Sequence, residues 1–432
     1  WLIGLNTEIA TYSKYDDQPM IIRYAQFKHN LTTGYILTET MDPKNELELT
    51  TKYVYDMYGN VISQTKSSPK IEIRKVRTKY ENGPYYPSHF INALNMITEF
   101  SYDARFGVVS KSIDPNNLIT ENTYDEWGRL IKTLNPDKTT STVAWNWCQK
   151  DCPEGVLYYQ LIISPNGIPS YKYFDKLSRE KLSRTIGWDN KDVLIDRQYD
   201  IRGNLIKISQ AHFVNESSHY THYKYDQLNR EILVTYPDDS YVKSIHNGLN
   251  TTSINSDQQM TTMIRNPAGM LIKSIDPTGN YTSHQYNSLL KISQTTSAMG
   301  IVTTFKYDIH GNLIYLNDPD RGEIYSQYNS LDLPIQQKQS GNNVTTYTYY
   351  DKLNRITLAV TPEGNSTFTY DKSKHGKGLI ASEEYRPIEK SQVSTELIYQ
   401  YDQYSRLQNK VHLFNGWKFT ESYKYDEYSR LK

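Results

Sequence analysis

Two cysteines, Cys148 and Cys152, are the residues of this sequence with the sharpest chemical potential. On a regular strand they would lie about 13 Å apart, too far for a disulfide, whereas a loop brings Cα atoms within the roughly 7 Å that a bridge requires. Pro153, Glu154 and Gly155 follow at once and favour a loop. The residues leave three states open: a small disulfide, two free thiols, or a metal site, which would need two further ligands although no histidine lies near the pair.

The other reactive side chains are spaced as structural residues would be. His219 and His222 stand three positions apart, which places them on opposite faces of a strand. The pair Asp238-Asp239 falls at a predicted turn, where solvated carboxylates are expected. The sequence has no Gly-x-Ser-x-Gly elbow and no phosphate-binding glycine loop. Apart from the open question of the cysteine pair, we predict no catalytic, cofactor-binding or metal-binding residue, and no cofactor.

Composition excludes several classes of partner. Lys+Arg and Asp+Glu are equal at 48 each, so no long-range field attracts nucleic acid or anionic lipid. No apolar run reaches the 18 or so residues that a membrane-spanning helix needs. The 39 tyrosines, together with evenly spaced glycine, proline, asparagine and aspartate, suit half-buried strands joined by tight turns. We therefore expect β structure, no nucleic-acid partner and no membrane span.

An internal repeat organises the chain. Its pattern is an aromatic residue, Asp or Asn, two variable residues, then Gly, Ser or Asn, often followed by Arg or Asn and an aliphatic residue. Through the middle of the chain the step is about 21 residues. The copies begin at Tyr55-Asp56, Tyr102-Asp103, Tyr124-Asp125, Phe174-Asp175, Tyr199-Asp200, Tyr225-Asp226, Tyr286-Asn287, Tyr307-Asp308, Tyr328-Asn329, Tyr350-Asp351, Tyr370-Asp371, Tyr401-Asp402 and Tyr425-Asp426.

Each copy is predicted to be a turn. An Asp at the first turn position accepts backbone N–H bonds, and a Gly at the fourth tolerates a left-handed conformation that costs other residues about 1–2 kcal/mol. A second, weaker turn signal such as Asp276-Pro277-Thr278-Gly279 lies about halfway between copies, so each period holds two strands and two turns. The structural turn residues predicted in this way are Asp56 with Gly59, Asp125 with Gly128, Asp200 with Gly203, and Asp308 with Gly311.

These turns predict an extended antiparallel ribbon. Roughly one strand per ten residues gives about 40 strands and a ribbon about 190 Å long. Strand twist prevents such a ribbon from lying flat, so it should coil, and one turn would enclose a space on the order of 60 Å across. Sizeable departures from the repeat occur near 65–100, 143–170 and 372–398. Because the chain starts at Trp1 and stops in mid-pattern at Lys432, we interpret it as a piece of a longer polypeptide.

The repeated motif resembles that of the RHS or YD-repeat proteins, which include bacterial polymorphic toxins, shell components of insecticidal toxin complexes, and animal teneurins. The resemblance covers nearly the whole chain. Tyr80 to Met96 is similar to a degenerate copy of the repeat. Trp145-Asn146-Trp147-Cys148 with Cys152-Pro153 resembles an insertion of bacterial members, and Trp1-Leu2-Ile3-Gly4-Leu5 resembles the entry into such a repeat region.

The resemblance implies an all-β fold, with residues 1–432 as one repeat region coiled into part of a hollow shell. It implies a non-enzymatic shell segment of a secreted or surface-delivered bacterial toxin. The partners implied are a C-terminal toxin domain of the same polypeptide, enclosed by the shell, and other subunits of a secretion or toxin complex. The family's self-cleaving core and variable toxin domain are not among these residues.

Two other functions stay open on the residues themselves. Tyrosine-rich faces offer an apolar body with a polar tip, so a cell-surface adhesive array that binds carbohydrate or a partner cell is the first alternative. An enzyme on a β scaffold is the second, by analogy with β solenoids that cleave polysaccharide. A catalytic site should appear as a departure from the repeat, and none of the three irregular segments gathers paired carboxylates with a base.

Overall fold

The structure is a computed structural model that describes residues 4–81, 83–150, 152–187, 189–341, 343–389 and 393–432. The first three residues of the predicted entry motif, Trp1-Leu2-Ile3, lie outside the described residues. So do Asn82 in the degenerate copy, Asp151 in the cysteine loop, and positions 390–392 of the last irregular segment.

The described chain is built from β strands and turns. The strands are β1 Glu8–Ser13, β2 Ile21–His29, β3 Ile36–Met41, β4 Leu49–Tyr55, β5 Val61–Ser68, β6 Ile71–Lys79, β7 His89–Ile91, β8 Ile97–Asp103, β9 Val108–Ile113, β10 Ile119–Tyr124, β11 Leu130–Leu134, β12 Thr140–Trp147, β13 Tyr158–Ile163, β14 Pro169–Phe174, β15 Glu180–Ile186, β16 Asp192–Tyr199, β17 Leu205–Ser209, β18 His212–Phe213, β19 Tyr220–Tyr225, β20 Glu231–Thr235, β21 Tyr241–Asn247, β22 Asn250–Asn255, β23 Met260–Arg265, β24 Leu271–Ile275, β25 Tyr281–Tyr286, β26 Ile292–Thr296, β27 Val302–Tyr307, β28 Leu313–Asp318, β29 Gly322–Tyr328, β30 Pro334–Gln339, β31 Val344–Tyr350, β32 Ile356–Val360, β33 Gly364–Tyr370, β34 Ile380–Pro387, β35 Thr395–Tyr401, β36 Leu407–Phe414 and β37 Trp417–Ser422. No helix occurs in the described ranges, so no described helix is long and apolar enough to cross a membrane.

All 37 strands belong to one antiparallel sheet in which strands adjacent in sequence are paired. Within the described ranges, the order is interrupted only at the two-residue strand β18, which pairs with β16 while β17 pairs with β19. The predicted all-β ribbon, with two strands in each period, is confirmed. The two kinds of turn alternate along the chain, so the Tyr-Asp corners lie along one edge of the ribbon and the intervening turns along the other.

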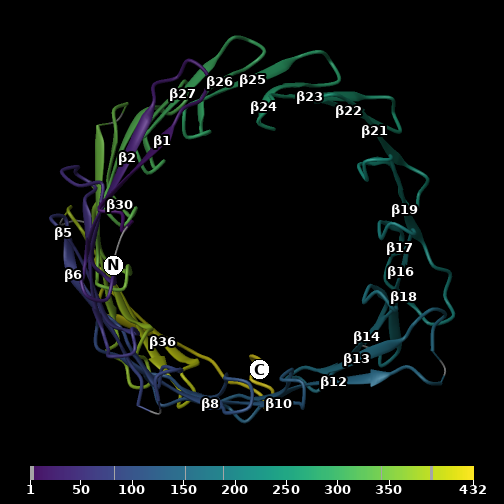
Figure 1. The fold of residues 1–432 in the computed structure, drawn as a ribbon, viewed down its shortest axis with the longest axis horizontal. Helices are drawn as coiled ribbons and strands as arrows, with labels where there is room; N and C mark the ends of the chain where they lie inside the picture. The colour runs from purple at the N-terminus through teal and green to yellow at the C-terminus, as the bar shows by residue number, and fades with distance from the viewer. Residues whose placement is uncertain (1–3, 82, 151, 188, 342, 390–392) are drawn as a thin grey trace.

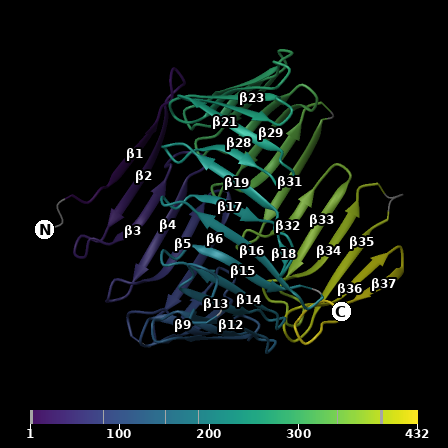
Figure 2. The ribbon, with the colours of Figure 1, turned by 90° about the vertical axis from the view of Figure 1, so that its right-hand side faces the viewer.

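The ribbon is wound into a ring and continues past its own beginning. Figure 1 shows a single wall on the side of β12 to β24, and two overlapping walls where β1 to β10 lie beside later strands. Seen from the side, the chain advances along the axis, so β1–β3 and β35–β37 lie at opposite ends of the particle (Figure 2).

The predicted width of about 60 Å is too large because one winding does not use the whole ribbon. Hydrogen bonds join residues of the two windings that are 251 to 292 positions apart. The first winding, from β1 to about β26, therefore contains roughly 25 strand spacings, which correspond to a diameter on the order of 40 Å. The later strands begin a second winding and do not widen the first.

The wall is thin and has a small core. Only six apolar residues are buried among those described: Leu47, Ile91, Leu182, Val234, Ala381 and Val411. The accessible surface is 27289 Å², about 1.6 times the roughly 17,000 Å² expected of a compact monomer of this mass. Apolar burial therefore contributes less to the stability of this fold than it does in a filled domain, and hydrogen bonds, including those at the ribbon edges, contribute more.

Candidate functional site

The corner at Asp125 shows how one repeat turns the chain. Oδ1 of Asp125 accepts hydrogen bonds from the backbone amides of Trp127 and Arg129, both at 2.9 Å. Oδ2 accepts from Nε of Arg129 at 2.7 Å. Gly128, at φ 76°, donates its amide to the Asp125 carbonyl at 3.1 Å. One carboxylate thus satisfies three donors and fixes the turn.

The other turn residues predicted from the sequence lie in corners of the same kind. Gly59, Gly203 and Gly311 have φ of 89°, 92° and 88°. Their partners Asp56, Asp200 and Asp308 each accept two backbone amides and the side-chain amide of the asparagine four positions later. Where the glycine is replaced, Ser178, Asn229, Asn354, Ser405 and Ser429 take the left-handed conformation, and so does Leu290.

The residue four places after the aspartate has a role that the turn pattern alone does not reveal. It is Arg or Asn in most copies, and it donates both its backbone amide and its side chain to the corner carboxylate. Some of these arginines also reach the next corner: Arg179 donates to the carbonyl of Asp200 at 3.1 Å, and Arg355 to both oxygens of Asp371 at 3.0 and 2.6 Å. The regular occurrence of Arg or Asn at this position was the available signal.

The tyrosine of the motif also has a specific partner. In ten of the copies its hydroxyl donates, over 2.6 to 3.0 Å, to a backbone carbonyl within two residues of the beginning of an earlier strand that starts at the same ribbon edge. The pairs are Tyr55 with Ile36, Tyr102 with Pro87, Tyr124 with Val109, Tyr199 with Glu180, Tyr225 with Leu205, Tyr286 with Leu271, Tyr307 with Ile292, Tyr350 with Pro334, Tyr401 with Ile380, and Tyr425 with Leu407.

These tyrosine bonds close a gap that the backbone pairing leaves. Between β26 and β27 the pairing ends at Gln294 opposite Thr304, two residues short of the corner edge. The carbonyl of Ile292 lies beyond that end, and the hydroxyl of Tyr307 donates to it at 2.9 Å. The motif tyrosine therefore replaces a missing ladder bond, which explains why a hydroxyl and not only an aromatic ring recurs at this place.

The corner environment shifts both groups toward the protonation states that they use. Burial raises the pKa of Tyr307 above its ordinary value, which keeps its hydroxyl a donor. Partial desolvation favours the neutral form of Asp125, but hydrogen bonds from the backbone and side chain of Arg129 outweigh it and hold the pKa of that carboxyl below its usual value. Asp125 therefore serves its corner as a charged acceptor.

The two windings meet along a seam, in which the intervening turns of the first winding contact Tyr-Asp corners of the second. At one end, Ser288 accepts from the amide of Tyr15 at 3.2 Å and donates to the carbonyl of Pro19 at 2.7 Å. Further along, Asn116 and Lys377 form two hydrogen bonds, both at 2.8 Å. Other seam contacts join Tyr15 to Asn266, Arg74 to Asp351 and Asn354, and Asp137 to Ser429.

The most buried ionic contact of the seam is centred on Asp42. Its side chain is 1% exposed and accepts from Nη2 of Arg23 at 2.7 Å within the first winding. His310, in a corner of the second winding, lies with Nε2 2.9 Å from the same oxygen and with Nδ1 2.7 Å from Asp332. Burial opposes ionisation of Asp42, but the bonds and charges of Arg23 and His310 outweigh it and lower the pKa of Asp42.

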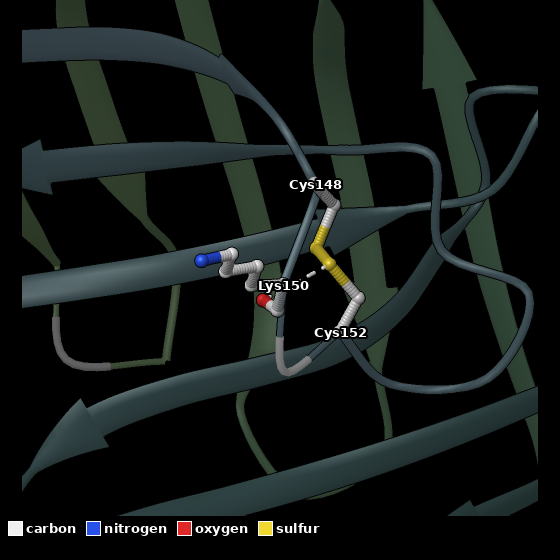
Figure 3. The surroundings of a disulfide bond; sticks show 3 residues. All are labelled: Cys148, Lys150 and Cys152. Carbon is white, nitrogen blue, oxygen red and sulfur yellow. Dashed lines mark hydrogen bonds between the residues drawn. A yellow bond between two sulfur atoms is a disulfide. The ribbon is translucent and has the colours of Figure 1, made fainter.

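Cys148 and Cys152 lie in the loop between β12 and β13. Of the states left open by the sequence, the structure contains the disulfide, with Cα atoms 5.8 Å apart (Figure 3). The carbonyl oxygen of Lys150 lies 3.4 Å from Sγ of Cys152. The amide of Cys148 donates to the carbonyl of Leu157 at 3.0 Å, so the bridge closes a loop whose two ends are already paired.

The remaining candidates are dispersed. His219 and His222 are exposed on and beside β19, and Asp238 holds a turn by accepting from the hydroxyl and amide of Ser240 at 2.6 and 3.1 Å. Among the described residues, no group of three or more His, Cys, Asp or Glu side chains is placed to hold a metal ion. The described residues are thus brought together mainly at the corners and along the seam.

Comparison with known proteins identifies the fold. No family model matches the sequence, and no curated protein matches it. Among solved structures, the chain is similar to the one described as TcdB2-TccC3-TEV, with a TM-score of 0.67 and 11% identity over 96% of this chain and 33% of that one. TcdB2-TccC3 without its hypervariable C-terminal region gives a TM-score of 0.61 and 10% identity over 96% of this chain and 36% of that one.

At this level of identity the comparisons establish the fold, and the chain spans about a third of the length of the proteins that it matches. The fold that they share is the wound antiparallel ribbon. The resemblance of the motifs and the likeness of the structures point to the same architecture. The chain therefore has the fold of an RHS or YD-repeat shell.

Proposed function

We propose that this chain is a non-enzymatic wall segment of a shell that encloses a toxin domain of the same polypeptide. The observation that supports the proposal best is the seam, because a ribbon that stacks a second winding on the first and joins them by hydrogen bonds forms a continuous barrier. The thin wall supports it as well, since a large accessible surface is expected of a wall around a space and not of a domain with a packed core. In this function the corner aspartates have a structural role.

The proposal extends to partners and location. A toxin domain lying beyond Lys432 would be the enclosed partner, and further subunits of a secretion or toxin complex would complete the shell at its two ends. The disulfide between Cys148 and Cys152 supports a secreted or cell-surface location, because such bridges persist in oxidising compartments.

Protease protection in the complete polypeptide that contains this chain tests the proposal. We expect the region downstream of Lys432 to resist a protease that cuts it rapidly once the shell is denatured. Replacing Asp42 with Asn should weaken the seam and accelerate that cleavage, whereas Asp238→Asn, in an exposed turn away from the seam, should not. Rapid cleavage of the downstream region while the wall stays intact would contradict enclosure.

A further inference from the structure

A pocket of about 350 Å³ lies at the corner edge of the first winding, around the ends of β11, β12 and β13. It is lined by Trp127, Arg129, Trp145, Asn146, Trp147 and Tyr158. The second winding contacts the opposite end of these strands, where Ser429 donates to Asp137. The pocket is therefore not covered by the seam.

The tryptophan rings of the pocket expose aromatic surface that does not pack against neighbouring strands. Cross-strand packing accounts for Tyr158, whose ring stacks on Phe174 at 5.0 Å and lies 5.8 Å from that of Trp145. Trp147 meets Tyr158 only edge-on at 6.4 Å and stays 69% exposed. Trp127, within the Asp125 corner, is 81% exposed. Large apolar rings left in water around one pocket are typical of a binding site.

The charge of the pocket favours an uncharged ligand. Arg129 is paired with Asp125 at 2.7 Å, so the pocket carries no uncompensated cation for an anion to neutralise. Its guanidinium lies over the ring of Trp145 at 4.9 Å, which opposes the approach of a second cation to that face. Arg179 and Arg355 donate terminal nitrogens to a neighbouring corner, whereas Arg129 lines the pocket.

We propose that this pocket binds a neutral saccharide. A sugar ring has an apolar C–H face that packs against indole, and hydroxyls around its rim that accept from a guanidinium and exchange hydrogen bonds with an amide such as that of Asn146. The volume lies within the range of about 300–1,000 Å³ found for small-molecule sites. The disulfide next to Trp147 closes the loop that joins the two aromatic strands and so holds one wall of the pocket in place. This binding activity is separate from enclosure.

A glycan array followed by calorimetry on the 432-residue chain tests the site. The array should contain neutral oligomers of glucose, N-acetylglucosamine, mannose and galactose beside sulfated and sialylated glycans. We expect binding to a neutral oligomer. Trp127→Ala and Trp147→Ala should each weaken it by about five- to tenfold, because each removes one stacking surface. Both rings are mostly exposed, so the fold should survive, which circular dichroism checks.

Trp417 provides the matched control, since its side chain is 67% exposed on β37 and lies outside the pocket. Trp417→Ala should leave the affinity unchanged. Binding to sulfated or sialylated glycans alone, or to no glycan, would overturn the proposal. So would an equal loss of affinity in the Trp417 and Trp127 variants. If Trp147→Ala fails to fold, the Trp127 variant decides the result alone.

Discussion

Replacing Asp42 with Asn should open the seam between the windings. Asp42 is almost wholly buried and accepts from Arg23 at 2.7 Å and from His310 at 2.9 Å. Breaking a buried ion pair costs about 3–5 kcal/mol, but the side chain of Arg23 is 33% exposed and regains water. We therefore expect a loss of about 2–3 kcal/mol of local stability.

Hydrogen exchange is the suitable assay, because a repeat ribbon can open locally without a global transition. Peptides that cover β3 and the corner of His310 should lose protection together in Asp42→Asn. A double-mutant cycle with His310→Gln should give a coupling of about 1–2 kcal/mol across the seam. The control is Asp238→Asn, in a turn outside the seam. Equal protection in the two aspartate variants, with no coupling to His310, would refute the assignment of Asp42 as the buried link.

Four further outcomes follow from single features. Leu290→Gly should raise the free energy of unfolding, measured by denaturant titration, by about 0.5–1 kcal/mol, because Leu290 holds φ 58° and is 51% exposed. A lower free energy of unfolding would speak against backbone strain. Tyr307→Phe should cost about 1 kcal/mol by leaving the carbonyl of Ile292 unpaired, seen as faster amide exchange in β26 and β27. The pKa of the corner aspartate Asp125 is lowered in the fold. Its contribution to stability is therefore complete above about pH 4 to 5 and is lost as the pH falls through the folded-state pKa. An unchanged denaturant midpoint between pH 5 and pH 3 would contradict this. Reducing the disulfide should cost about 2 kcal/mol, with faster exchange confined to the loop between β12 and β13.

The corners were predictable because their chemistry is local. Asp125 and its donors lie within four positions of one another, so the pattern that marks the turn also contains its hydrogen-bond partners. The alternation of two turn types predicted the antiparallel ribbon for the same reason. Leu290 shows the limit of this logic, because a leucine at the glycine position carries no turn signal of its own, and its corner is marked only by Asn287, whose side chain accepts from the amides on either side of Leu290.

The seam was not predictable from the sequence. Asp42 and His310 are 268 positions apart, and the partners of Ser288, Tyr15 and Pro19, are 273 and 269 positions from it. Contacts of this kind depend on how many strands complete one winding, which twist and corner geometry determine jointly. The predicted width of 60 Å was wrong for the same reason, because the number of windings is a property of the accumulated twist and not of any one repeat.

Hydrogen bonds to the backbone explain how this architecture persists at 10–11% identity over 96% of the chain. Ten of the motif tyrosines donate to a backbone carbonyl, and corner aspartates such as Asp125 accept from backbone amides, so these contacts do not depend on the side chain of the backbone partner. Few apolar residues are buried, which leaves few positions where side-chain volume is constrained. Side-chain changes in the strands should therefore be tolerated as long as the hydrogen bonds of the corners are kept. The departures from the corner pattern, such as the loop with the disulfide and its tryptophans, are accordingly where individual functions can be added to a common wall.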